Sequence, residues 1–78
     1  MTRSAKTVAK MKVNPRDWRI EDLKVIADAN GIAYRQPGGS HVIFRHLNGA
    51  MLSVPAKRPI KPVYVMKFVR LIEEGIAE

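Results

Sequence analysis

The part of the sequence that most constrains the fold is a pair of apolar runs around Asn48-Gly49. Residues 41–46 are rich in β-branched and aromatic side chains, which is typical of a strand. Residues 51–54 form a second short apolar run, and an Asn-Gly pair between two such runs is typical of a β-hairpin. We therefore predict two antiparallel strands joined by a turn at residues 47–49.

The register of this hairpin has two possibilities, which differ in where the apolar side chains lie. A two-residue Asn-Gly turn would pair Ile43 with Val54. A three-residue loop, with its glycine left-handed at a bulge, would pair Phe44 with Leu52 instead. We favour the second register because it gathers four apolar residues on one face, and one-sided burial fixes the register of a strand. These four are Val42, Phe44, Leu52 and Val54, and the other face then carries His41, Ile43, Arg45, Met51 and Ser53.

Two segments with helical periodicity lie on either side of the strands. In residues 18–30 the apolar residues share one face of a helix, and Asn30-Gly31 can end it. A second helix is predicted from Pro62, which suits the first helical position, to Gly75. The expected buried stripes are Ile20, Leu23, Ile26 and Ala27 in the first helix, and Val65, Phe68, Val69 and Ile72 in the second.

These elements predict an α+β fold in one small domain at residues 17–78. With a short strand at residues 32–35, the order is helix, three antiparallel strands, helix, and both helices are expected on the apolar face of the sheet. Residues 1–16 precede this domain with five basic residues, no acid and no sustained apolar period. We interpret them as a flexible basic arm or as an extension that docks on a partner.

The chain is strongly basic, and its charge is unevenly distributed along the sequence. The formal net charge is +7, and residues 31–70 contain seven Lys or Arg residues and no Asp or Glu. Because few of these charges can be buried unpaired, most of them are expected on the surface. Such a surface suits nucleic acid, a membrane surface or an acidic protein, and from composition alone a purely solubilising role explains it equally well.

Several classes of chemistry are excluded by residue type and spacing. The sequence has no cysteine, and therefore no disulfide, thiolate metal site or cysteine nucleophile. His41 and His46 are five apart on one strand, so they face opposite sides and cannot share a metal. No apolar stretch approaches the roughly 20 residues needed to span a membrane, and no segment resembles a secretory signal. We expect no metal, no cofactor, no membrane contact and a cytoplasmic location.

Two features carry candidate chemistry. His41 follows a flexible Pro-Gly-Gly-Ser loop and shares a face with Arg45, so it can move a proton beside a bound phosphate. From position alone, a surface histidine without a role is the more frequent case. Lys57, Arg58 and Lys61 lie beside the start of the second helix, where backbone N–H groups favour anions such as phosphates. A solvated run of charges is the equally frequent alternative.

A resemblance to a known family is carried by the run Gly39-Ser40-His41-Val42-Ile43-Phe44-Arg45-His46, which is similar to the Gly-Ser-His strand of HicA-type toxins. Residues 47–49 lie where that family has its turn. Residues 52–55, Leu-Ser-Val-Pro, look like its third strand ending in Val-Pro, and residues 61–72 look like its last helix. The resemblance covers about residues 18–74, and Lys57 stands where many family members have a histidine.

This resemblance implies a fold like that of double-stranded-RNA-binding domains and an mRNA-cleaving endoribonuclease toxin. It implies that His41, the histidine of the Gly-Ser-His motif, is the catalytic residue of a metal-free reaction. The residues expected to bind RNA are Ser40, Arg45, Lys57, Arg58 and Lys61. The alternatives are a non-catalytic RNA-binding module of the same fold and a domain that binds only an acidic protein.

The resemblance also implies a partner, a HicB-type antitoxin that holds the toxin inactive. Ile43 and Met51 are apolar residues on an otherwise polar sheet face, and apolar area beside charge often marks a protein contact. We therefore expect the antitoxin to cover His41, Ile43, Arg45 and Met51, and to exclude RNA by occupying its place.

Overall fold

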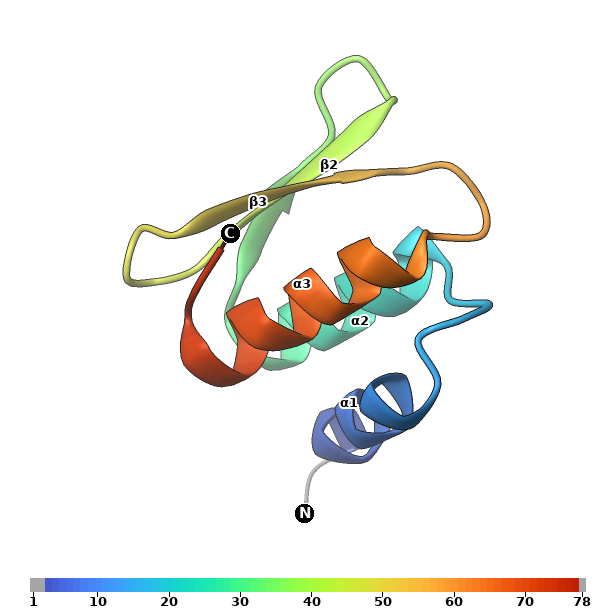
Figure 1. Cartoon of the computed structure of the whole chain (residues 1–78). Helices are drawn as coiled ribbons and strands as arrows, with labels where there is room; N and C mark the ends of the chain where they lie inside the picture. The colour runs from blue at the N-terminus through green and yellow to red at the C-terminus, as the bar shows by residue number, and fades with distance from the viewer. Residues whose placement is uncertain (1–2, 78) are drawn as a thin grey trace.

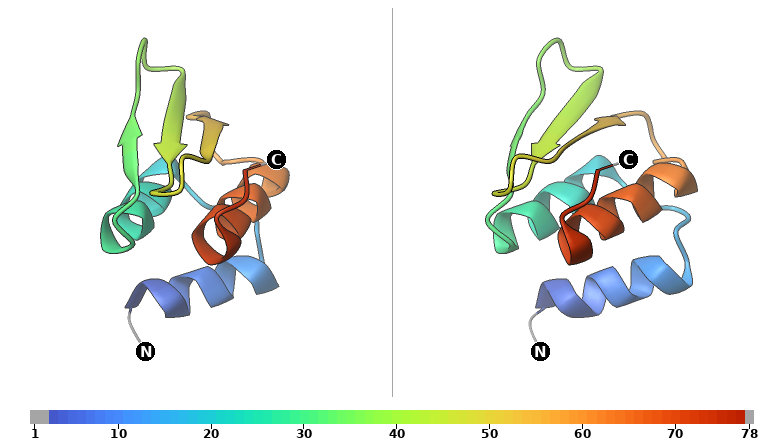
Figure 2. Two further views of the ribbon diagram at one scale, coloured as in Figure 1. Left: turned by 90° about the vertical axis from the view of Figure 1, so that its left-hand side faces the viewer. Right: turned by 60° about the vertical axis from the view of Figure 1, so that its left-hand side comes forward.

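The computed structural model describes residues 3–77, which form an α+β fold in three layers (Figure 1). A three-stranded antiparallel sheet with the order β1-β2-β3 is the first layer. Helix α2 packs under β1 and α3 under β3, and α1 packs beneath both helices as the third layer (Figure 2). The elements are α1 (Arg3–Val13), α2 (Ile20–Ala29), β1 (Ala33–Arg35), β2 (His41–Arg45), β3 (Met51–Pro55) and α3 (Pro62–Glu74). No helix among the described residues is long and apolar enough to cross a membrane.

The hairpin has the register that one-sided burial predicts. Val42 pairs with Val54 and Phe44 with Leu52, and all four side chains are almost completely buried. The turn closes with the His46 N–H donating to the Ala50 carbonyl at 2.8 Å. Gly49 has a φ of 95°, the left-handed conformation that the three-residue loop requires. The predicted three-residue loop is thus confirmed.

Both predicted helices are present, and their ends lie close to the predicted positions. Arg19 is the N-cap of α2, and its backbone N–H donates to Asp22 Oδ2 at 3.0 Å. Pro62 opens α3, and Gly75 ends it with a left-handed φ of 68°. These two helices and the sheet bury one apolar core, in which the rings of Phe44 and Phe68 meet edge to face at 4.9 Å.

The buried stripe of α3 differs from the prediction at one position. Leu71 is fully buried, whereas Ile72 is only partly buried. Leu71 lies one helical turn before Gly75, on the side of α3 that meets the β2–β3 turn. There Asn48 Nδ2 donates to the Gly75 carbonyl at 2.9 Å. The β2–β3 turn is therefore joined to the end of α3, a contact that the periodicity of the helix does not predict.

The flexible arm predicted for residues 1–16 is wrong for residues 3–13, which form helix α1. Val8 and Met11 are buried in the same core as the sheet, with exposed fractions of 5% and 0%. An ion pair of 3.2 Å between Lys12 Nζ and Glu73 Oε1 also joins α1 to α3. Val8 and Met11 share one face but Val13 does not, which is too weak a period to predict a helix, so docking on α2 and α3 stabilises it. Residues 1 and 2 of the arm, and Glu78 of the predicted domain, lie outside the described residues.

Candidate functional site

The face of the sheet opposite α2 and α3 is not covered by any element of the described chain. It carries the polar row that the hairpin register predicts, together with two residues of β1 that pair with β2. We call this set the open sheet face: Ala33, Arg35, His41, Ile43, Arg45, Met51 and Ser53. Sequence reasoning missed Arg35 as part of it. The signal that could have placed it is the β1–β2 register, in which Arg35 pairs with Ile43.

His41 is exposed and begins β2 at one end of this face. Its Nδ1 lies 3.1 Å from Ser40 Oγ, and its strand partner is Pro55. When the Nδ1–H donates to the hydroxyl, the imidazole has an unprotonated Nε2 that can accept a proton from a bound molecule. Ser40 therefore lies where it orients the imidazole, and the Ala56 N–H holds the Ser40 carbonyl at 2.9 Å.

Arg45 lies on the same face as His41 but at the opposite end of β2. Four residues of a strand span about 13 Å, so the backbones of these two residues are far apart along the face. Arg35 is nearer, because its partner Ile43 is only two residues from His41. Two guanidinium groups and one imidazole thus follow the open sheet face at separate positions, a spacing that suits an extended anion rather than a single small one.

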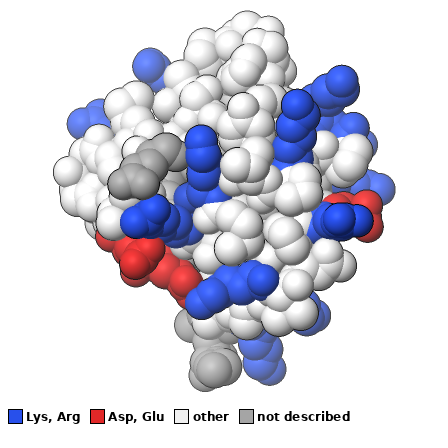
Figure 3. All heavy atoms as spheres, viewed as in Figure 1, with Lys and Arg blue, Asp and Glu red and all other residues white. Residues whose placement is uncertain are grey.

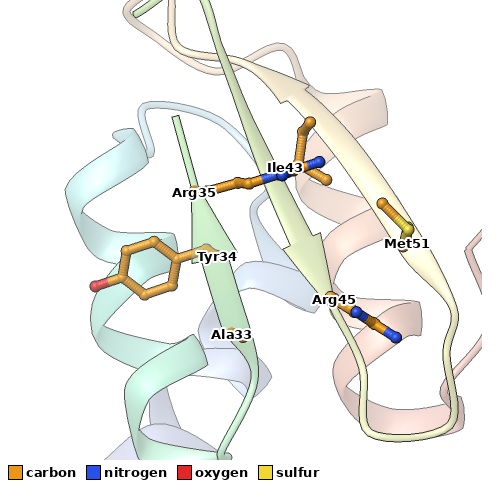
Figure 4. A pocket seen from close by; sticks show the side chains of 6 residues that line it. All are labelled: Ala33, Tyr34, Arg35, Ile43, Arg45 and Met51. Carbon is orange, nitrogen blue, oxygen red and sulfur yellow. The ribbon is translucent and has the colours of Figure 1, made fainter. Parts of the chain in front are cut away.

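The middle of the open sheet face is hollowed (Figure 4). A depression of about 240 Å³ is lined by Arg35, Ile43, Arg45, Met51 and parts of β1. The Arg35 side chain extends across β2 at Ile43, whereas Tyr34 extends the other way, over α2. Tyr34 Oη donates to Asp28 Oδ2 at 3.2 Å. Burial of the hydroxyl is the larger cause that raises the pKa of Tyr34, and this hydrogen bond is the second. This tyrosine is therefore engaged by α2 and does not offer its ring to a ligand on the open face.

The three basic residues expected to bind phosphates lie together in the β3–α3 loop. Lys57, Arg58 and Lys61 are all exposed and line one groove of about 620 Å³. Pro55, the strand partner of His41, lines the same groove. The groove therefore begins at the strand partner of His41, whereas Arg45 lies at the other end of β2.

Arg58 is not a free cation, because its guanidinium forms an ion pair with Glu21 of α2. The pKa of Glu21 is held below its ordinary value. The largest cause is a hydrogen bond from backbone N–H at the start of α2, and the positive charge of Arg58 adds to it. The pair ties the β3–α3 loop to the start of α2. Ile60 strengthens this tie, since its N–H donates to the Trp18 carbonyl at 2.9 Å.

We expect replacement of Glu21 by glutamine to lower thermal stability slightly at pH 7 and to have less effect at pH 3. A carboxylate whose folded pKa is depressed stabilises the fold above its ordinary value of 4.5, and this contribution is lost as the pH falls through the folded pKa. Thermal unfolding of parent and variant at both pH values measures the effect. An equal difference in Tm at pH 7 and pH 3 would contradict the ion-pair explanation.

The second histidine has a structural position. His46 Nδ1 accepts the Asn48 N–H at 3.1 Å inside the β2–β3 turn, at the end of β2 far from His41. No group of three or more histidines and carboxylates within the described residues could hold a metal ion. His41 is therefore the histidine that lies on the open sheet face.

Basic side chains outnumber acidic ones on the face of the molecule seen in Figure 3. In the orientation of Figure 1, Lys and Arg side chains are spread across the surface, and the acidic side chains form two small groups among them (Figure 3).

Comparison of the chain with protein-family models, with curated proteins and with solved structures gives no match. The chemistry of the open sheet face and of the basic groove is therefore what indicates the function.

Proposed function

We propose that this chain is a small endoribonuclease toxin of the HicA type, with the fold of a double-stranded-RNA-binding domain extended by α1. The observation that supports it best is the position of His41. It is exposed on an uncovered sheet face, it contacts Ser40, and it lies across the strand pair from the first residue of a basic groove. A proton-transfer group beside a phosphate-binding groove is what cleavage of RNA by its own 2′-hydroxyl requires.

In the proposed reaction His41 Nε2 accepts the proton of a ribose 2′-hydroxyl. The 2′-oxygen attacks the adjacent phosphorus, and the 5′-oxygen leaves and takes a proton from water. The hydroxide left by that water takes the proton from His41, which returns the imidazole to its starting form. The products are a 2′,3′-cyclic phosphate and a 5′-hydroxyl end. Lys57 is the first cation after the end of β3, two residues beyond the strand partner of His41, so we assign it to the charge that develops on the phosphoryl oxygens. Lys61 binds a neighbouring phosphate of the backbone, and Arg58, through its ion pair with Glu21, holds the loop in place.

Product analysis tests this proposal directly. Single-stranded RNA is incubated with protein that has been treated with EDTA, and the new ends are identified chemically. We expect 5′-hydroxyl ends that are absent when His41 is replaced by alanine, and no cleavage of an oligonucleotide whose 2′-hydroxyls are methylated. RNA that is bound but stays intact would instead support a non-catalytic RNA-binding module.

A toxin of this kind acts in the cytoplasm and needs a partner that masks it, and the open sheet face fits such a partner. Met51 is 50% exposed and Ile43 partly exposed, between Arg35 and Arg45 in the hollow. We propose that a HicB-type antitoxin places an apolar side chain in this hollow and carboxylates beside the two guanidinium groups. Because His41 begins the same row, the bound antitoxin also covers the catalytic residue.

The variant Arg45→Glu is expected to weaken antitoxin binding by tenfold or more and to weaken RNA binding more modestly. Reversing a charge at a contact with an acidic partner replaces attraction by repulsion, whereas for RNA it removes about one phosphate contact. Affinities for antitoxin and RNA are measured side by side, with Lys10→Glu on α1 as the control of equal net charge. A complex in which His41 stays open to solvent would contradict the masking role.

A further inference from the structure

The groove at the β3–α3 loop is built from two segments that are distant in the sequence. One segment is the α1–α2 connection at residues 16 and 17, and the other runs from residue 55 to residue 64. The residues that line the groove are Arg16, Asp17, Pro55, Lys57, Arg58, Pro59, Ile60, Lys61, Pro62 and Tyr64. Its volume of about 620 Å³ lies within the roughly 300–1,000 Å³ that is typical of small-ligand pockets. The Ile60–Trp18 hydrogen bond holds the two segments together.

The charge of this groove is suited to an anion. Arg16, Lys57 and Lys61 are exposed, and within residues 3–77 none of the three is in an ion pair. Arg58 is already balanced by Glu21, and Asp17 is the single acid among the lining residues. Three free cations against one carboxylate leave the groove positive, and they come from both of its walls.

The remaining lining is apolar and rigid, which distinguishes the groove from a simple phosphate site. Three prolines and the ring of Tyr64 contribute to it, and Lys67 Nζ lies 5.8 Å from the centre of that ring. Bases of single-stranded RNA stack on aromatic side chains, and apolar walls of this kind give them a surface to rest on. A duplex presents its phosphates outside and its bases inside, so it would contact the cations but not these walls.

We propose that this groove binds one nucleotide of a single-stranded RNA substrate beside the bond that is cleaved. Arg16 and Lys61 contact the backbone from opposite walls, and Tyr64 contacts the base. The groove starts at Pro55, directly across the strand pair from His41, so a nucleotide in it is adjacent to one positioned at the imidazole. This inference rests on the proposed ribonuclease function, and it adds a substrate form and a residue, Arg16, that lies before the segment resembling the toxin family.

Binding of a labelled single-stranded oligoribonucleotide to the non-cleaving His41→Ala protein tests the charged wall. In that background, Arg16→Glu is expected to weaken binding by about tenfold, and Lys10→Glu by no more than about twofold. Both substitutions change the net charge equally and both lie at exposed positions, but Lys10 is outside the groove. Asp17→Asn is expected to strengthen binding a few-fold, because it removes the single acid. Asparagine also tolerates the left-handed φ of 64° at this position.

The apolar wall is tested by Tyr64→Ala, with Tyr64→Phe as its matched partner. Loss of the ring is expected to weaken binding of the single strand by about tenfold, and phenylalanine is expected to restore most of it. Thermal unfolding of both variants shows whether they are folded, since Tyr64 is half-buried against the core. Binding of the same sequence as a duplex is expected to be insensitive to Tyr64.

The outcomes separate this inference from the proposed function. If the parent cleaves RNA while Arg16→Glu and Lys10→Glu bind it equally, the groove is not the subsite and the ribonuclease proposal stands. If binding depends on Arg16 and Tyr64 but the parent cleaves nothing, the groove proposal holds for a binding module and the ribonuclease proposal fails. If the duplex binds as the single strand does and depends equally on Tyr64, the assignment to single strands is overturned.

Discussion

The His41→Ala protein is expected to cleave single-stranded RNA about 10²–10⁴-fold more slowly than the parent. His41 is the histidine that lies on the open sheet face, and its side-chain contact is the Ser40 hydroxyl. Removing the imidazole leaves water as the acceptor of the 2′-hydroxyl proton. The cations of the groove still bind the backbone, so the loss falls on the rate of the chemical step and not on RNA affinity.

The design of this experiment depends on the position of both histidines. Because His41 is exposed and its hydrogen bond is to a neighbouring side chain, alanine there should leave the fold intact. His46→Gln is the matched control: it removes the other imidazole, at the far end of β2, and cleavage is expected to stay at the parental rate. First-order rate constants at saturating protein separate chemistry from binding. A His41→Ala protein as fast as the parent would remove the general base from the mechanism.

The hairpin could be predicted from the sequence because its pattern has only one satisfactory solution. Shifting the register by one residue would move Phe44 or Leu52 from the core to solvent, and the glycine at position 49 supplies the left-handed residue that the three-residue loop needs. The same register correctly placed His41, Ile43, Arg45 and Met51 on one exposed face. A feature determined by local pattern and burial was therefore within reach of sequence reasoning.

Features that depend on pairing between distant segments could not be predicted in this way. Strand β1 has three residues, too few for a pattern that shows which side faces solvent, so Arg35 was missed. Arg16 and Asp17 reach the groove only because the β3–α3 loop returns to Trp18. Nor does the acid-free stretch of residues 31–70 show that Arg58 is neutralised, since its partner comes from α2.

Helix α1 illustrates the same limit from the side of energetics. Its own sequence carries many lysines, and a helix of this length is marginal in water unless tertiary contacts stabilise it. Those contacts come from surfaces of α2 and α3 that are visible only once the two helices lie on the sheet. Met11 is the residue on which this docking depends most, because it is the larger of the two core side chains and is fully buried.

Replacing Met11 by alanine is expected to destabilise the whole domain by about 2–5 kcal/mol, since it removes a fully buried side chain and leaves a cavity between α1 and the other helices. A domain of this size has a total stability on the order of 4–12 kcal/mol, so the loss is a large share of it. The Tm is expected to fall by about 10 °C or more.

Val13→Ala is the matched control on the same helix: Val13 is 87% exposed, and its truncation should change the stability by less than about 0.5 kcal/mol. Thermal unfolding followed by circular dichroism measures both variants. Equal Tm values for the two would mean that α1 does not dock in solution, and that residues 3–13 act as the basic arm that their composition suggests.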